Sequence, residues 1–274
     1  MNIQLNDRGI LEITGQDRLK FLQGLVTNDV YKLEEKKILY AALLTPQGKY
    51  LYDFFLIHHS HCVWIDVALS QINGVKQRLS LYKLRSDINI KDDSQNVFIG
   101  CLDHPQNELS FEDPRFPALG FRCYKADPWD LPLDQGLYQL KCLEWGIPSP
   151  EDMIPEKGTP LECGLQDLHA ISWDKGCYMG QELTARTKYR GLVRKRLFPI
   201  LFEGDILPFG APIYLFQDPA TEVGQIRTSS QGRAIAMLRL EFMDIFLKEN
   251  LALVCEGIEL KVIQPAWMKL DAVL

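Results

Sequence analysis

One octet of the sequence combines a cysteine, a lysine and two glycines in a pattern that suggests nucleophilic chemistry. Cys177 stands between Gly176 and Gly180, two residues after Lys175, in the run KGCYMGQE, and a basic segment that should be helical follows. A thiol at a turn, near an ammonium group and ahead of a helix N-terminus, is favoured as the nucleophilic thiolate. We therefore expect Cys177 to be a reactive thiol assisted by Lys175. A small buried cysteine is the ordinary alternative.

Cations are concentrated in the segment after this octet. Arg186, Lys188, Arg190 and Arg194 lie close together and the two residues after Arg194 are also basic, whereas the whole chain has a formal net charge of −6. The acidic balance argues against a protein that coats nucleic acid indiscriminately. A local anion site beside Cys177 and a plain solvated linker both remain open for this basic run.

The octet resembles the K-G-C-Y-x-G-Q-E signature of the YgfZ family, which is related to the glycine-cleavage T-protein, an aminomethyltransferase. Three other parts of the chain match the family in the same order. The first, residues 13–30, contains ITGQDR, FLQG and TNDV. The second is TPQGK at residues 45–49, and the third is EWGIP at residues 144–148.

The resemblance implies a pocket for tetrahydrofolate. Glu144 matches the glutamate with which T-proteins hold the pterin, and a carboxylate can accept two parallel hydrogen bonds from that ring; a helix-surface glutamate is the alternative. Tyr138 would stack on a flat ring or serve as a core aromatic. Arg8 stands at the pocket edge, where an aromatic stands in relatives. Asp53 retains one of the two adjacent acids of T-protein transferases, because Tyr52 occupies the other position.

On this basis we predict a YgfZ-like protein that binds tetrahydrofolate and uses Cys177 in iron–sulfur cluster assembly or repair, and thereby in tRNA modification. The cations at residues 186–194 would hold the folate tail or tRNA phosphates. Expected partners are iron–sulfur enzymes or their assembly factors. The residues do not decide whether the protein is a catalyst. A glycine-cleavage aminomethyltransferase, disfavoured by the missing acid, and an RNA or protein docking module without folate are the alternatives.

Composition sets broader bounds. Seven scattered cysteines suggest reduced thiols and, with no signal-peptide pattern at the start, a cytoplasmic location. No apolar run approaches the roughly 18 residues of a membrane span, so no membrane partner is expected. His58, His59, His61 and Cys62 are close in sequence, but neighbouring strand residues point to opposite sides and no second cluster completes the set. No metal site is therefore predicted.

The elements that would position these residues indicate an α+β protein. Strands are expected at residues 10–14, 37–44, 50–57, 62–68, 88–91 and 97–102, and helices at 17–25, 72–82 and 133–145. The interval around Pro105, Pro114 and Pro117 should be irregular. Six short strand-like runs then suggest a small closed β-barrel: 197–202, 211–216, 222–228, 233–240, 251–255 and 258–262. The resemblance implies the same plan, a ferredoxin-like folate-binding domain at residues 1–195 and a C-terminal barrel domain at 196–274.

Overall fold

The computed structural model describes residues 1–191, 193–242 and 252–269 and divides into two compact units. The first unit comprises Met1–Tyr138 and Leu168–Gln181, and the second comprises Gln139–Asp167 and Glu182–Leu274. The chain therefore leaves the first unit and comes back to it for Leu168–Gln181, here called the returning segment, which carries Cys177. The predicted domains were two continuous pieces, and that division stays a prediction.

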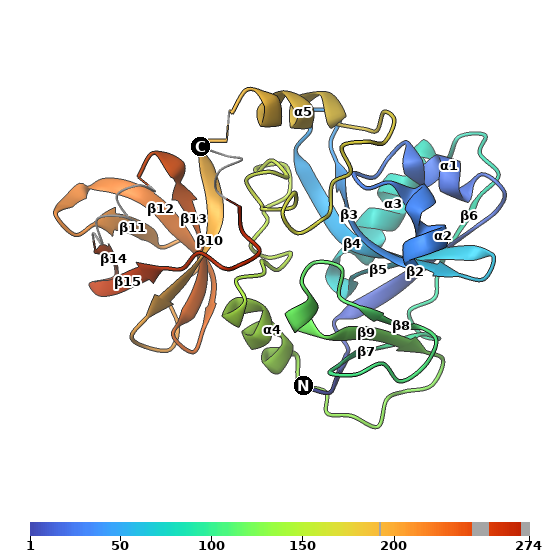
Figure 1. The fold of residues 1–274 in the computed structure, drawn as a ribbon, viewed down its shortest axis with the longest axis horizontal. Helices are drawn as coiled ribbons and strands as arrows, with labels where there is room; N and C mark the ends of the chain where they lie inside the picture. The colour runs from blue at the N-terminus through green and yellow to red at the C-terminus, as the bar shows by residue number, and fades with distance from the viewer. Residues whose placement is uncertain (192, 243–251, 270–274) are drawn as a thin grey trace. The chain divides into compact units, whose positions relative to one another are not determined.

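The main sheet of the first unit has five antiparallel strands in the order β3-β4-β5-β2-β6 (Figure 1). The strands are β2 Arg8–Thr14, β3 Ile38–Leu44, β4 Tyr50–His59, β5 Cys62–Ala68 and β6 Asn89–Asp92. All five were predicted from alternating or continuously apolar runs. Strands β3 and β5 are buried along their whole length, which shows that both faces of this sheet are covered.

Helices α1 (Arg18–Gln23), α2 (Leu33–Lys36) and α3 (Ile72–Lys83) supply the cover for one face. Side chains alternate along a strand, so residues 39, 41 and 43 of β3 and 63, 65 and 67 of β5 share this face. They form one apolar core with Leu22 and Val75 from the helices. The even-numbered residues of β3 and β5 point to the opposite face, where the polar residues described below are found.

A second sheet in the first unit has the order β1-β7-β9-β8. The strands are β1 Ile3–Leu5, β7 Phe98–Leu102, β8 Ser110–Glu112 and β9 Phe121–Lys125. Strands β8 and β9 fall where the prolines predicted irregular structure, and that prediction is wrong for these two stretches. Pairing of β9 with β7, which is distant in sequence, provides the ladder that local composition does not reveal.

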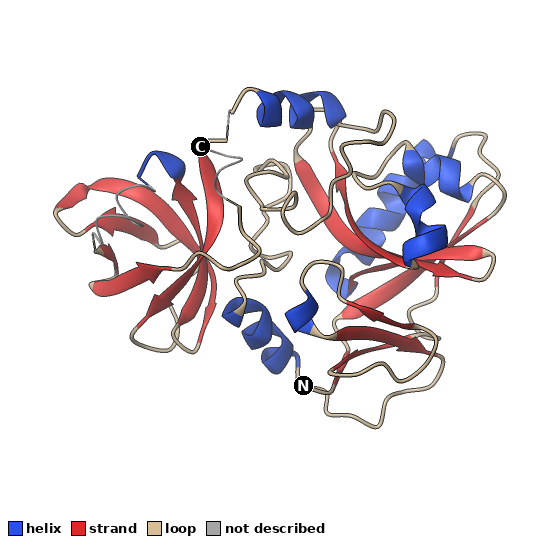
Figure 2. Cartoon of the chain, viewed as in Figure 1, coloured by secondary structure: helices blue, strands red, loops and turns tan. Residues whose placement is uncertain are grey.

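The second unit contains a closed barrel of six strands in the order β10-β13-β12-β11-β14-β15 (Figure 2, in which all strands are red). The strands are β10 Lys195–Phe202, β11 Pro212–Leu215, β12 Asp218–Ser230, β13 Arg233–Arg239, β14 Leu253–Cys255 and β15 Ile258–Val262. The predicted barrel is confirmed; residue 251 of its fifth predicted run lies outside the described residues. Helices α4 (Gln135–Glu144) and α5 (Gln181–Tyr189) are also found where helices were expected.

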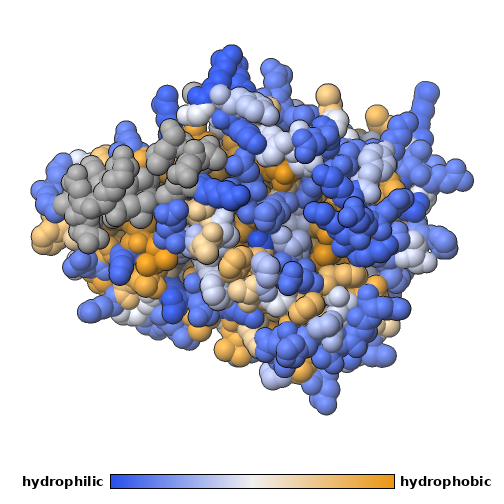
Figure 3. Space-filling view, in the orientation of Figure 1, coloured by the Kyte–Doolittle hydropathy of each residue, from blue (hydrophilic) through white to orange (hydrophobic). Residues whose placement is uncertain are grey.

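Among the residues that the structure describes, no helix has both the length and the apolar character needed to cross a membrane. Hydrophilic residues dominate the face shown in Figure 3, and apolar ones occur there singly or in small groups.

Candidate functional site

The returning segment is fixed to the main sheet by two polar residues of the TNDV motif. The hydroxyl of Thr27 donates to the carbonyl of Ala170 (2.6 Å), and the amide nitrogen of the Asn28 side chain donates to the carbonyl of His169 (2.8 Å). The backbone N–H of Ser172 donates to the Thr27 carbonyl (3.1 Å). Thr27 and Asn28 are themselves buried. Their role in the structure is therefore to hold the segment that carries Cys177.

Lys175 provides a second attachment. Its Nζ donates to the carbonyl oxygens of Gln23, Val26 and Asn28 at 2.8, 2.7 and 2.7 Å, at the end of α1 and in the loop after it. A cation is favourable at a helix C-terminus, and an ammonium group has three donors, all of which these carbonyls use. Burial lowers the pKa of Lys175 to about 8. These contacts make Lys175 an anchor of the loop; its predicted assistance to the thiol stays a prediction.

Gly180 closes the loop on the other side of Cys177. It has φ +80°, and a Cβ atom placed on it would lie 2.6 Å from the carbonyl oxygen of Thr45 and 2.9 Å from the Cα of Gly48. Glycine is required there by both conformation and space. Gly176 differs, since a Cβ on it would have nothing within 4 Å. The loop is thus packed against the β3–β4 turn after the cysteine and open just before it.

Cys177 is exposed between these attachments. All seven cysteines lie in the described residues and none is in a disulfide, and the other six are buried. The alternative that Cys177 is a small buried packing residue is therefore wrong. A thiol on a loop held at both ends can meet another molecule without a large loss of loop entropy.

A buried network of charges occupies the other face of the main sheet, with Asp66 at its centre. Its carboxylate accepts hydrogen bonds from Arg8 Nε (2.7 Å), Arg122 Nη2 (2.6 Å) and the hydroxyl of Tyr124 (2.9 Å). Asp66 is 0% and Arg122 1% exposed. Burial alone would raise the pKa of Asp66, but the guanidinium groups of Arg122 and then Arg8 outweigh it and hold that pKa below 3.8.

The network continues through Arg115. Its guanidinium pairs with both carboxylate oxygens of Asp113, at 3.0 and 2.7 Å. The hydroxyl of Tyr138 accepts hydrogen bonds from Arg115 Nη2 (2.5 Å) and Arg122 Nη1 (3.0 Å). The ring of Phe55 lies under both guanidinium groups, with its centroid 4.0 Å from Arg122 and 5.0 Å from Arg115. Charge and aromatic contacts thus stabilise these buried cations together.

Asp53 lies beside this network with its own partners. Its carboxylate accepts hydrogen bonds from the hydroxyls of Tyr40 (2.8 Å) and Tyr50 (2.5 Å), and the Tyr40 ring lies 5.6 Å from the guanidinium of Arg115. Tyr52, at the position of the missing acid, packs instead with the helix-side core. The two positions therefore serve opposite faces of the sheet.

Strand register explains how these residues meet. Tyr40 is paired with Phe55, and Phe55 with Asp66, across β3, β4 and β5. The sequence predicted roles for Arg8, Asp53 and Tyr138 but did not reveal the rest of the network: Tyr40, Tyr50, Asp66, Asp113, Arg115, Arg122 and Tyr124. A signal was present, because Asp66 interrupts the apolar run CVWIDVA, and a charge in a strand buried on both faces needs a partner.

The four residues predicted to hold tetrahydrofolate fit that group only in part. Polar atoms of Arg8, Asp53 and Tyr138 already have protein partners inside the first unit. Glu144 is exposed and is the last residue of α4, in the second unit. It is the one residue of the four that offers an exposed carboxylate to a ligand.

The predicted anion-binding residues lie on α5 and after it. Arg186, Arg190 and Arg194 are exposed and Lys188 is half-buried. Arg196, the last cation of the run, is buried and pairs with Asp167 at 2.7 Å, so it contributes to structure instead.

Arg194 also lines a pocket of about 710 Å³ in the second unit. The other residues of its wall are Glu162, Val193, Lys195, Arg239, Leu240 and Glu241. Three cations against two acids leave this wall with a small positive excess.

Two members of the histidine cluster, His59 and Cys62, lie together across β4 and β5. Cys62 Sγ lies 3.6 Å from His59 Nδ1, and the His59 ring stacks on Trp64 with centroids 3.8 Å apart. Burial raises the pKa of Cys62 to about 12. No group of three metal-ligating side chains occurs within the described ranges.

Comparison with known proteins first defines the class of fold. The chain superimposes on the aminomethyltransferase T of the glycine cleavage system from Bartonella henselae with a TM-score of 0.76, over 97% of this chain and 86% of that one, at 13% identity. Residues 194–270 match the family model of the CAF17 C-terminal β-barrel domain. The chain therefore has the T-protein fold with a CAF17-type barrel, which confirms the predicted fold class.

Particular relatives are found among iron–sulfur cluster assembly factors named IBA57. The chain is 28% identical to the mitochondrial factor of Mus musculus, covering 87% of this chain and 77% of that protein. It is 30% identical to the Aspergillus oryzae homologue and 32% identical to that of Mycosarcoma maydis, over 80% and 71% of this chain. It spans 61% of the Aspergillus oryzae protein and 54% of the Neurospora crassa homologue.

These relatives correct one prediction. They are named as mitochondrial proteins, so the inference of a cytoplasmic location from scattered cysteines is wrong. Reduced thiols occur in more than one compartment, and cysteine usage separates oxidising from reducing surroundings only.

Proposed function

We propose that this protein takes part in iron–sulfur cluster assembly through the thiolate of Cys177. The observation that carries the proposal is the exposure of Cys177 alone among seven cysteines, on a loop attached on both sides. The names of the IBA57 relatives support the same role. Thiolates are the protein ligands that iron–sulfur clusters use most.

The chemistry proposed is a ligand exchange on the cargo cluster. The Cys177 thiol loses its proton to solvent, and its sulfur forms a bond to a cluster iron. One donor thiolate leaves the same iron and takes up a proton, so neither iron nor sulfur changes oxidation state. The attached loop orients the sulfur outward, and no other cysteine of the chain is exposed to compete for the iron.

Cluster transfer in vitro tests this proposal. Transfer of a [2Fe–2S] cluster from a donor scaffold protein to an apo-ferredoxin, followed by visible circular dichroism, should be accelerated by the wild-type protein. Cys177→Ser should lower that acceleration about tenfold or more, since a hydroxyl is a poor ligand for iron. Gly176→Ala, at the open position beside it, is the matched control and should retain activity. Wild-type acceleration by Cys177→Ser would refute the proposal.

Tetrahydrofolate binding is a finer part of the proposal and is supported by the exposed carboxylate of Glu144 and by the octet's resemblance to the YgfZ family. In that case Glu144 would make the direct hydrogen bonds to the folate. The contribution of Arg8, Asp53 and Tyr138 would be to the structure of the first unit. Calorimetric titration with tetrahydrofolate should show binding that Glu144→Ala abolishes and Cys177→Ala spares. Absence of binding by the wild-type protein at millimolar ligand would remove folate from the proposal and leave the thiol's role intact.

A contribution to tRNA modification is the other finer part. The exposed cations Arg186, Arg190 and Arg194 support contact with phosphates. Arg186→Glu with Arg190→Glu should reduce tRNA retention in a gel-shift assay, and the reduction should be greatest at low salt. Equal retention by the double variant would exclude this surface as the RNA site.

A further inference from the structure

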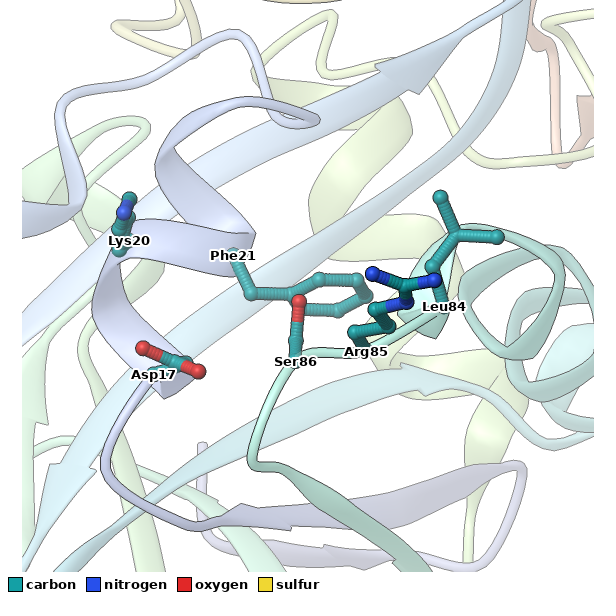
Figure 4. Close-up of a pocket in the computed structure, with 6 residues that line it drawn as sticks. All are labelled: Asp17, Lys20, Phe21, Leu84, Arg85 and Ser86. Atoms are coloured by element: carbon teal, nitrogen blue, oxygen red, sulfur yellow. The ribbon is translucent and has the colours of Figure 1, made fainter.

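A pocket at the ends of α1 and α3 contains none of the residues assigned above to the cysteine loop, the buried charge network or the predicted folate and anion sites. It has a volume of about 780 Å³ and is lined by Asp17, Lys20, Phe21, Leu84, Arg85 and Ser86. In Figure 4 the Phe21 ring extends from α1 toward the segment that carries Leu84, Arg85 and Ser86. These six residues are called the α1–α3 pocket. It is an apolar floor bordered by charged side chains, which is the usual composition of a binding site.

The acid of the pocket wall, Asp17, already has a partner within the chain. The backbone N–H of Asp87 donates to Asp17 Oδ2 (2.8 Å), and the N–H of Asp17 donates to the Asp87 carbonyl (3.2 Å). Lys20 and Arg85 are exposed and make no ion pair with any described residue. The wall therefore presents two cations that are available to a ligand.

Leu84 is a strained residue at the mouth of this pocket. It ends α3 with φ +43° and ψ −112°, a conformation that costs a side-chain-bearing residue about 1–3 kcal/mol. Its side chain is 87% exposed, so packing within the chain does not compensate. Leu81, one turn earlier, is 63% exposed. Contact with another molecule would account for two exposed leucines three residues apart, one of them strained.

The charges around the pocket decide what that molecule is. Residues 72–87, helix α3 and the segment after it, carry four cations, Lys76, Arg78, Lys83 and Arg85, against one acid, Asp87, although the chain as a whole has a net charge of −6. Complementarity with this local positive charge requires an acidic partner. The exposed apolar side chains, Leu81 and Leu84, are aliphatic, and the aromatic residue of the wall, Phe21, is only 8% exposed and leaves little of its face for stacking a base, which favours a polypeptide over RNA.

We propose that the α1–α3 pocket, with Leu81 and Leu84, docks an acidic segment of a partner protein that inserts a leucine or phenylalanine side chain. The apolar side chain fills the space over Phe21 and beside Leu84, and flanking carboxylates pair with Lys20 and Arg85. This surface goes beyond the proposed cluster chemistry and does not involve Cys177.

Fluorescence anisotropy with a defined probe tests the docking surface. The probe is a short fluorescein-labelled peptide in which glutamates flank two leucines and one phenylalanine, and the protein is titrated into it. Saturable binding is expected. Arg85→Glu should raise the Kd about tenfold or more, while Lys261→Glu, the same charge reversal on an exposed lysine of β15, should leave it within about twofold.

A second variant separates docking from folding. Leu84→Gly removes the exposed side chain and relieves the backbone strain, so Tm should stay the same or rise while the peptide Kd rises about fivefold. Cys177→Ser should bind the peptide as the wild type does, which keeps this result distinct from cluster transfer. Equal binding of a probe with serines in place of its apolar residues, or binding of an RNA oligonucleotide but not of the peptide, would overturn the proposal.

Discussion

The Cys177 loop and the Asp66 network lie in the same unit, but the central side chain of the loop is exposed whereas that of the network is buried. The loop uses buried hydrogen bonds from Thr27, Asn28 and Lys175 to hold a thiol in solvent. The network uses the same kinds of bond to enclose a carboxylate that solvent does not reach. A reactive group on a fixed loop can act on another molecule, whereas an enclosed ion pair can act only on the fold that contains it.

This difference predicts that substitutions in the network lower the stability of the fold, whereas substitution of Cys177 removes activity without lowering stability. Substitutions at the centre of the network should cost much stability, because they leave partners buried and unpaired. Substitution at the exposed thiol should cost almost none. The attachments of the loop should fall between these limits.

The largest effect is expected for Asp66→Asn. Asparagine has the size of aspartate but lacks its charge, so the guanidinium groups of Arg8 and Arg122 would stay buried without their anion. The free energy of unfolding in urea should fall by about 3–5 kcal/mol. Lys91→Met, which removes the exposed lysine of the pair with Asp93, is the control and should have a much smaller effect. A loss for Asp66→Asn no greater than the control would show that the network is not a determinant of stability.

The same carboxylate should make stability depend on acid pH. Its pKa is held below 3.8 in the folded protein, so the unfolded chain binds the proton more readily. Stability from Asp66 is therefore present above about pH 4 and is lost as pH falls toward the folded pKa. Unfolding midpoints measured between neutral pH and pH 2 should fall less steeply for Asp66→Asn than for the wild type. Parallel curves for the two proteins would contradict this assignment.

The network also shows which features of the fold could not be predicted from the sequence. Apolar runs separated by turn residues predicted strands β2 to β5 and the six barrel strands, because the alternation or run of apolar residues that a buried strand needs is visible within a short segment. The Cys177 octet was found because its residues are contiguous. Asp66 and Arg122, by contrast, are 56 residues apart and meet only when β9 joins the second sheet, in a stretch where prolines predicted no strand. In the sequence, the contact between these strands is visible only as a charged residue, Asp66 or Arg122, among the apolar residues of each strand.

A loss of intermediate size is expected for Lys175→Met. Methionine fills the buried space of the lysine chain but leaves the carbonyls of Gln23, Val26 and Asn28 without their donor. The cost should be about 2–4 kcal/mol. Hydrogen exchange should accelerate in residues 23–28 and in the returning segment. Lys175→Arg, which keeps the charge, should recover part of the loss; equal exchange in the wild type and Lys175→Met would exclude an anchoring role.

Two glycines of the octet give a matched pair. Gly180→Ala places a Cβ 2.6 Å from the Thr45 oxygen at φ +80°, and should cost about 1–3 kcal/mol. Gly176→Ala meets nothing within 4 Å and should be neutral in thermal unfolding. Equal Tm values for the two variants would show that contact with the β3–β4 turn does not hold the loop.

The smallest effect on stability is expected for Cys177→Ser. The side chain is exposed and its replacement is nearly isosteric, so unfolding should change by no more than about 0.5 kcal/mol. Iodoacetamide should modify one thiol per native wild-type chain, as counted by intact mass, and none in the variant. A stable and unmodified variant that no longer transfers clusters would place the activity in the thiol itself. Modification of a second thiol in the native protein would show that one of the six buried cysteines becomes accessible, and the assignment of cluster binding to Cys177 alone would fail.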